Sequence, residues 1–250
     1  MSGSLVGRQV VVLGGSRGVG RETALRCAGE GAKVLAVARN AGALAELAQT
    51  ARGIEVLALD GASEVAPGQV FALAKPDLLV ICGGATPSTR SLPELSWSEF
   101  SVNWEVDVKM TFQFCREALK APLSPGSVVA IISSGAGLGG SPISGGYAGA
   151  KRMQMFIAKY SQAESDRRGL GIHFVALVPS RVMPETELGR AAVGGYARHL
   201  GISDEKFLED MGPRQSPGDV ADAVIALAVN PPSNLASIFV VSAEGVTGTV

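Results

Sequence analysis

The chain has 250 residues, 46% of them hydrophobic, and a formal net charge of -1 at pH 7. This length suits one α/β domain with a large core, and the balanced charge excludes a basic face for nucleic acid. The three cysteines lie in apolar stretches without metal-like spacing, and no stretch resembles a signal core or a membrane span. We therefore expect a cytoplasmic protein with reduced thiols, no metal, and no nucleic-acid or membrane partner.

The chain begins with the pattern of a strand, a glycine-rich turn and a helix. The β-branched run 9–13 is followed by Gly-Gly-Ser-Arg-Gly-Val-Gly at 14–20 and then by a helical pattern. Such a turn presents free N–H groups and the positive end of a helix dipole to a diphosphate. An ordinary strand-to-helix turn is the alternative. The residues expected to bind a diphosphate-containing cofactor at this turn are Gly14, Ser16, Arg17, Gly18, Val19 and Gly20.

A second strand is predicted over 33–38, and it ends at Arg39. A βαβ unit that binds NAD usually has an acidic residue near this point to hold the ribose hydroxyls. A guanidinium instead suits the 2′-phosphate of NADP, and Arg17 would be a second donor. The sequence therefore favours NADP(H) over NAD(H), the alternative being that each arginine is a solvated surface cation.

Two further strands lead into residues suited to a nucleotide. The strand 54–59 precedes Asp60 and Gly61, and the carboxylate there would accept a hydrogen bond from the adenine amino group or form a turn. The strand 77–82 leads into a glycine pair, where backbone can lie against a ribose. We therefore expect Asp60, Gly61 and Gly84 in the cofactor site.

A long helical periodicity covers 97–119. Its apolar positions include Phe100, Trp104 and Phe112, and we expect most of this stripe to pack into the core. Asp107 lies one position off the stripe.

The strongest chemical signal follows the apolar strand 128–132. That strand ends at a serine pair, a glycine-rich loop follows, and a helix then carries Tyr147 and Lys151 four positions apart, on one face. An ammonium there favours phenolate over phenol, which helps the tyrosine to donate a proton to a carbonyl. Ser134, thirteen positions before Tyr147, would hydrogen-bond the same oxygen. The set predicts reduction of a ketone or oxidation of an alcohol; the alternative is a half-buried ring beside a solvated lysine.

The last third of the chain adds strands at 172–178 and 236–241, and a helix at 220–229. Between them, 184–213 has a mixed apolar and charged composition, which predicts short amphipathic helices. These helices would form a lid over the substrate; the alternative is a surface excursion without that role. Strands and helices alternate throughout. We therefore expect a single α/β domain over 1–250 with a doubly wound parallel sheet, the Rossmann fold, and ligands at the carboxyl ends of the strands.

With these residues assembled, the chain resembles the short-chain dehydrogenase/reductase family over nearly its whole length. Residues 13–20 match the family pattern Thr-Gly-x-x-x-Gly-x-Gly, with Leu13 in place of threonine. The family's Ser, Tyr and Lys correspond to Ser134, Tyr147 and Lys151. The resemblance implies a nicotinamide-dependent oxidoreductase for a small carbonyl or alcohol substrate, usually a homodimer or homotetramer, in which the tyrosine passes the proton and the nicotinamide the hydride. The residues that it places near the carboxamide are Pro179, Val182 and Thr186.

The chain departs from the family pattern at two points that bear on chemistry. Residues 81–84 read Ile-Cys-Gly-Gly where the family has Asn-Asn-Ala-Gly, and Asp107 stands in place of an asparagine thought to hold a water for proton relay. A carboxylate at this point could hold water, but it would also pair with the Lys151 ammonium. The departures leave open a rival function, an NADP(H)-binding regulator without turnover. A third possibility keeps the same frame and runs dehydration or epimerisation through transient oxidation.

Overall fold

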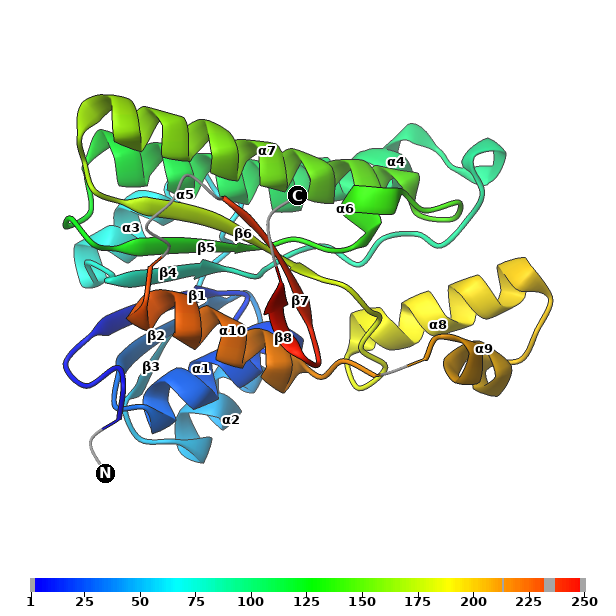
Figure 1. The fold of residues 1–250 in the computed structure, drawn as a ribbon, viewed down its shortest axis with the longest axis horizontal. Helices are drawn as coiled ribbons and strands as arrows, with labels where there is room; N and C mark the ends of the chain where they lie inside the picture. Colours follow the sequence, from blue (N-terminus) through cyan, green and yellow to red (C-terminus); the bar gives the residue numbers. More distant parts are fainter. Residues whose placement is uncertain (1–2, 213, 232–236, 248–250) are drawn as a thin grey trace.

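The computed structural model describes residues 3–212, 214–231 and 237–247 (Figure 1). Within these residues one sheet has the strand order β3-β2-β1-β4-β5-β6-β7-β8, and only β8 runs antiparallel to its neighbour. The strands are β1 (Gln9–Leu13), β2 (Lys33–Ala38), β3 (Ile54–Ala58), β4 (Leu78–Ile81), β5 (Val128–Ile132), β6 (His173–Pro179), β7 (Ile238–Ser242) and β8 (Gly245–Thr247).

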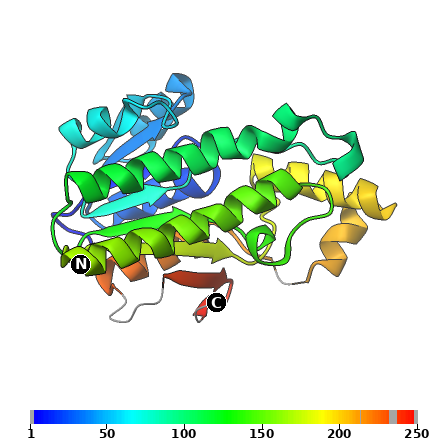
Figure 2. The same cartoon turned by 90° about the horizontal axis from the view of Figure 1, so that it is seen from above.

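Helices cover both faces of the sheet (Figure 1). The helices on one face are α1 (Gly18–Gly29), α2 (Ala41–Thr50) and α10 (Pro217–Val229). Those on the other face are α3 (Ala66–Leu73), α4 (Trp97–Asn103), α5 (Lys109–Lys120) and α7 (Gly145–Arg168). Figure 2 shows α5 and α7 side by side over the strands. The remaining elements are the 3-10 turn η1 (Leu92–Glu94), the π-helix η2 (Trp104–Val108), α6 (Ala136–Gly139), and the pair α8 (Glu187–Leu200) and α9 (Asp204–Asp210), which extends past the end of β6.

Alternating side chains of each strand feed two separate cores. In β1, Val10 and Val12 pack toward α1, α2 and α10, while Val11 and Leu13 pack toward α3, α5 and α7. The central strands are therefore apolar at nearly every position, as expected for a parallel sheet covered on both faces. The predicted doubly wound α/β fold is confirmed.

Several short elements were not predicted, among them α6 and β8. The glycine-rich loop after β5 contains the single turn α6, and the three-residue β8 pairs with β7. Both are too short for a periodic pattern to reveal them. Ala236, the first residue of the predicted last strand, and Pro213, the last residue of the predicted lid segment, lie outside the described residues, as do residues 1–2.

The predicted stripe along 97–119 is wrong in part. The π-helix η2 interrupts the helix, so the apolar phase before it does not continue into α5. Trp97 is 76% exposed and Phe112 is 50% exposed, whereas Met110 and Phe114 face the core. None of the described helices has both the length and the apolar character to cross a bilayer.

Candidate functional site

A cleft of about 820 Å³ opens at the carboxyl ends of the parallel strands. Its walls come from the segments that follow β1 to β6 and from the first turns of α8. The cleft is thus lined by segments that lie far apart in the sequence. The sequence-predicted residues that line it are Gly14, Ser16, Arg17, Gly18, Val19, Arg39, Asp60, Gly61, Gly84, Asp107, Ser134, Tyr147, Lys151, Pro179, Val182 and Thr186.

The glycine turn lies where the direction of strand progression reverses, between β1 and β4. Gly14 has a φ of +80°, and a Cβ on it would lie 2.5 Å from the Gly83 Cα, so the two turns meet backbone to backbone. Gly20, also predicted to bind the cofactor, does not line the cleft. A Cβ there would lie 2.2 Å from the Gly14 carbonyl oxygen, so this glycine allows α1 to pack behind the turn.

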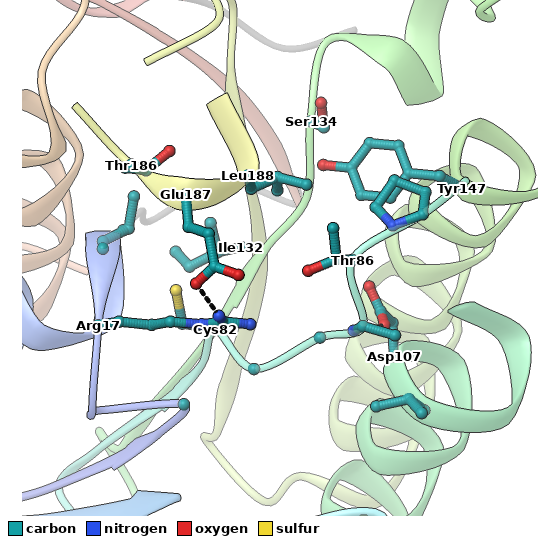
Figure 3. Close-up of a pocket in the computed structure, with 18 of the residues that line it drawn as sticks. Arg17, Cys82, Thr86, Asp107, Ile132, Ser134, Tyr147, Thr186, Glu187 and Leu188 are labelled. Carbon is teal, nitrogen blue, oxygen red and sulfur yellow. Dashed lines mark hydrogen bonds and ion pairs between the residues drawn. The ribbon is translucent and has the colours of Figure 1, made fainter. Parts of the chain in front are cut away.

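The first turn of α1 faces the cleft without a side-chain cap. Arg17 occupies the N-cap position in extended conformation and makes no cap hydrogen bond. Its guanidinium instead pairs with Glu187 in the first turn of α8, the dashed contact in Figure 3. Both side chains are more than half exposed, so this ion pair contributes little to stability and exchanges readily with another anion. No local pattern indicates this pair, because the partners are 170 positions apart.

The ends of β2 and β3 form the opposite wall. Arg39 lines the cleft beside Asn40, whose side chain caps α2 by accepting a hydrogen bond from the Ala43 N–H at 3.0 Å. Asp60 lines the cleft and also accepts from the Ala62 N–H at 3.1 Å, so it forms the turn that was one of its two predicted roles.

Ser134 and Tyr147 face the same part of the cleft (Figure 3). The neighbouring Ser133 hydroxyl donates to the Lys151 carbonyl at 2.8 Å, which ties α7 to the end of β5. A Cβ on Gly146 would lie 1.9 Å from the Phe100 carbonyl oxygen, so α4 packs directly on the first turn of α7. These contacts fix the position from which Tyr147 projects.

Lys151 is buried, with 5% of its surface exposed. Its ammonium donates to the Ile132 carbonyl at 3.2 Å and to Gln154 Oε1 at 2.9 Å, and it lies 5.5 Å from the centre of the Tyr147 ring. Burial has the largest single effect and would lower the pKa of Lys151, but the charge of Asp107 together with the acidic groups of Tyr147 and Cys82 outweighs it, and the pKa is raised above its ordinary value. The alternative of a solvated lysine is therefore wrong, and the cation beside the phenol is permanent near neutral pH.

Asp107 lies in η2 with 1% of its surface exposed. Its Oδ1 accepts hydrogen bonds from the Ala85 N–H at 2.9 Å and from Asn103 Nδ2 at 3.3 Å. Oδ2 lies 3.3 Å from Lys151 Nζ, which forms the expected ion pair, but it has no hydrogen bond of good geometry among the described residues. A Cβ on Gly84 would lie 2.7 Å from Oδ2, so only glycine lets the backbone pass this carboxylate.

Gln154 is a further residue of this site and was not predicted from the sequence. Its Nε2 donates to Thr111 Oγ1 at 2.8 Å, which turns Oε1 toward Lys151. The orientation is fixed chemically, because an ammonium can only donate. The three-residue spacing from Lys151 on one helix could have indicated this contact.

The cysteine near the site is not activated. Cys82 lines the cleft, and burial raises the pKa of its thiol to about 11, despite the nearby Lys151 cation. Burial likewise raises the pKa of Cys115 to about 12, so this thiol is not activated either. No cluster of three potential metal ligands occurs among the described residues.

The family model described as short chain dehydrogenase matches residues 8–192. The chain belongs to this family. It is therefore an oxidoreductase that acts on hydroxyl or carbonyl groups. An uncharacterised short-chain type dehydrogenase/reductase of Sinorhizobium fredii is 35% identical over 188 residues, which cover 74% of this chain and 73% of that protein.

Two more distant similarities concern an enzyme and a solved structure. An L-xylulose reductase of Mesocricetus auratus is 26% identical over 129 residues. The match covers 52% of this chain and 53% of that protein, so the chain spans about half the length of this relative. The crystal structure of a 3-ketoacyl-(acyl-carrier-protein) reductase from Brucella melitensis, complexed with NADH, superposes with a TM-score of 0.74 at 22% identity over 90% of this chain and 92% of that one. The second likeness shows the shared fold.

Proposed function

We propose that this short-chain dehydrogenase is an NADPH-dependent ketone reductase that also oxidises secondary alcohols in the reverse direction, with Tyr147 as the acid and base. The observation that carries the proposal is the buried ammonium of Lys151, 5.5 Å from the ring of a tyrosine that shares one cleft with Ser134. The L-xylulose reductase named above gives independent support for a carbonyl substrate.

The cleft fits a dinucleotide. Glycine leaves the backbone open at the first turn, and no side chain caps the N-terminus of the twelve-residue α1. A diphosphate at this helix end would take up the N–H groups of the first turn. Toward the other end, Pro179, Val182 and Thr186 line the cleft beside Ser134, where we propose that they hold the carboxamide.

The proposed reaction divides between cofactor and chain. The nicotinamide, when bound, supplies a hydride to the carbonyl carbon. Ser134 and Tyr147 donate hydrogen bonds to the carbonyl oxygen, and the phenol gives its proton to that oxygen as the alkoxide charge develops. Lys151 stabilises the phenolate that remains, and a proton from solvent restores the phenol. The alcohol forms with one hydride and one proton, and oxidation follows the same steps backward.

Two good hydrogen bonds direct the Lys151 ammonium. The bonds to the Ile132 carbonyl and to Gln154 occupy two of its three N–H groups and leave the third for another acceptor. We propose that this third N–H reaches the nicotinamide ribose. Asp107 would hold the water that returns a proton to the site, since its Oδ2 has no well-aligned partner within the described residues.

Replacing Gln154 with methionine is expected to lower kcat for ketone reduction by about 100-fold, because the ammonium loses the acceptor that aims it. Steady-state rates and thermal unfolding of the purified variants measure the effect. Gln113→Met is the matched control, since Gln113 is also buried but does not contact Lys151. Equal losses of kcat in the two variants would show that activity depends on any buried glutamine and not on the orientation of the Lys151 ammonium.

Arg39 and Arg17 support the choice of NADPH, since both residues line the cleft; Arg39 lies at the end of β2, and the Arg17 guanidinium would have to leave Glu187 to reach a phosphate. Replacing Arg39 with alanine is expected to weaken NADPH binding by about tenfold and to leave NADH binding nearly unchanged, because only the first carries a 2′-phosphate. Fluorescence titration with each nucleotide measures the dissociation constants for NADPH and NADH. An unmodified chain that binds NADH more tightly than NADPH would contradict the role of Arg39.

We further propose that α8 and α9 act as a lid, that the Arg17 and Glu187 pair holds it against the cofactor turn, and that the chain acts as a homodimer or homotetramer. The exposed rings of Phe112, Phe156 and Tyr160 on α5 and α7 support self-association.

The decisive experiment mixes the protein, NADPH and a panel of small ketones and follows nucleotide absorbance and products. Consumption of NADPH with formation of the secondary alcohol supports the proposal. Tight NADPH binding with no turnover of any ketone would favour a regulator. Products of dehydration or epimerisation without net nucleotide consumption would favour the third function.

A further inference from the structure

Three hydroxyl groups form a continuous chain between α8 and the loop that leads into α7. The Ser144 hydroxyl donates to Ser141 Oγ at 2.8 Å, and Ser141 Oγ lies 2.7 Å from the Tyr196 hydroxyl. The Ile143 N–H also donates to Ser141 Oγ, at 3.4 Å. These contacts join the proposed lid to the helix that carries the reactive tyrosine.

Counting protons shows what this chain offers to a ligand. Ser141 has two lone pairs, and Ser144 and Ile143 N–H occupy them, so Ser141 donates its own proton to Tyr196. The Tyr196 proton then has no acceptor among the described residues. Ser144 has given its proton away and keeps its lone pairs. One end of the chain is thus a hydrogen-bond donor, and the other end is an acceptor.

Both ends of the chain lie on the wall of the cleft. Tyr196 and Ser144 line it, whereas Ser141 does not. The Tyr196 ring is held by parallel stacking on Phe207 of α9, with 5.6 Å between centroids and 1° between planes. Ser144 precedes α7 but makes no cap bond there, so its lone pairs are not used by the helix. The donor and the acceptor are therefore positioned before any ligand arrives.

We propose that Tyr196 and Ser144 together bind a hydroxyl group of the substrate, at a carbon other than the one that reacts. A hydroxyl both accepts and donates, so it satisfies both ends of the chain at once, whereas an alkyl group satisfies neither. The inference rests on the proposed function and narrows it: the substrate is a ketone that carries at least one further hydroxyl group, and the product carries at least two. Tyr196 is a specificity-determining residue in this scheme, and it takes no part in hydride or proton transfer.

Binding to the enzyme–NADPH complex tests the inference without turnover, since an alcohol cannot react with reduced nucleotide. The probes are xylitol and pentan-2-ol, which share a five-carbon chain and differ in hydroxyl groups, and the fluorescence of bound NADPH reports their binding. We expect the unmodified protein to bind xylitol at least tenfold more tightly than pentan-2-ol. In Tyr196→Phe we expect that preference to fall roughly tenfold, with the affinities for pentan-2-ol and NADPH unchanged.

Ser144→Ala should reduce the same preference from the acceptor end, and Tyr160→Phe, on an exposed ring of α7, should leave it unchanged. Thermal unfolding of each variant identifies a loss of preference that is caused by misfolding. If Tyr196→Phe does not fold, the result for Ser144→Ala decides the test. The inference is overturned if the unmodified protein binds pentan-2-ol as tightly as xylitol, or if folded variants at both ends keep the preference. A separate assay with L-xylulose and pentan-2-one tests the proposed function: absence of hydride transfer there, with the polyol preference intact, would remove the reaction but keep the binding site.

Discussion

Tyr147→Phe is expected to lower kcat for ketone reduction by a factor between about 10² and 10⁴, because the ring remains but the proton donor is lost. The affinity for NADPH should stay within about twofold, since no part of the proposed diphosphate site is changed. Ketone-dependent absorbance changes measure the first quantity, and nucleotide fluorescence measures the second.

The geometry around Tyr147 makes this result specific. Its ring is fixed by the packing of α4 on the start of α7, so phenylalanine can occupy the same place. Tyr160→Phe removes a hydroxyl from an exposed ring of the same helix and should keep full activity. Turnover that survives in the Tyr147 variant would eliminate the proposed mechanism.

Lys151→Met is expected to abolish detectable turnover and to reduce the free energy of unfolding at pH 7 by about 3–5 kcal/mol. The second effect arises because Asp107 would remain buried without its cation. Urea unfolding measures it. Lys159→Met, at an exposed position of the same helix, is the matched control and should change stability by less than about 0.5 kcal/mol.

The difference in unfolding free energy between the unmodified protein and Lys151→Met should depend on pH in one direction. The folded-state pKa of Lys151 is raised, so its contribution to stability is complete below the unfolded-state pKa of about 10.4 and is lost as the pH rises through the folded-state value. The difference in unfolding free energy between the unmodified protein and Lys151→Met should therefore be constant from pH 7 to about 10 and narrow above that range. A difference that narrows as the pH rises from 7 to about 10 would be incompatible with a raised pKa of Lys151.

Much of the fold could be predicted because its signals are local. Buried parallel strands are continuous apolar runs, and each is followed by a turn rich in glycine or polar residues, so β1, β2 and β5 begin and end where the sequence indicates. Tyr147 and Lys151 could be paired because a single helix fixes their spacing. Their association with the first glycine turn followed from the rule that parallel strands end at one edge of the sheet.

The unpredicted contacts depend on how distant segments pack. Glu187 meets Arg17, and Tyr196 meets Ser141, only because α8 folds back over the strand ends. Gln154 faces Lys151 because Thr111 on another helix holds its amide. Phe112 was assigned to the core because a regular helix was assumed through a segment that contains a π turn.

The π-helix η2 also makes the site sensitive to chain length. A π turn holds one more residue than an α turn of the same rise, so deletion of one residue from Trp104–Val108 would restore a regular helix and rotate the preceding segment by about 100°. Asn103 and the N-terminal half of this helix would then point away from Asp107 and Ala85, while every side chain of the reactive set kept its identity. Relatives that share these residue types but differ by one position in this segment would thus present a different wall to the nucleotide, a difference that identity scores do not register.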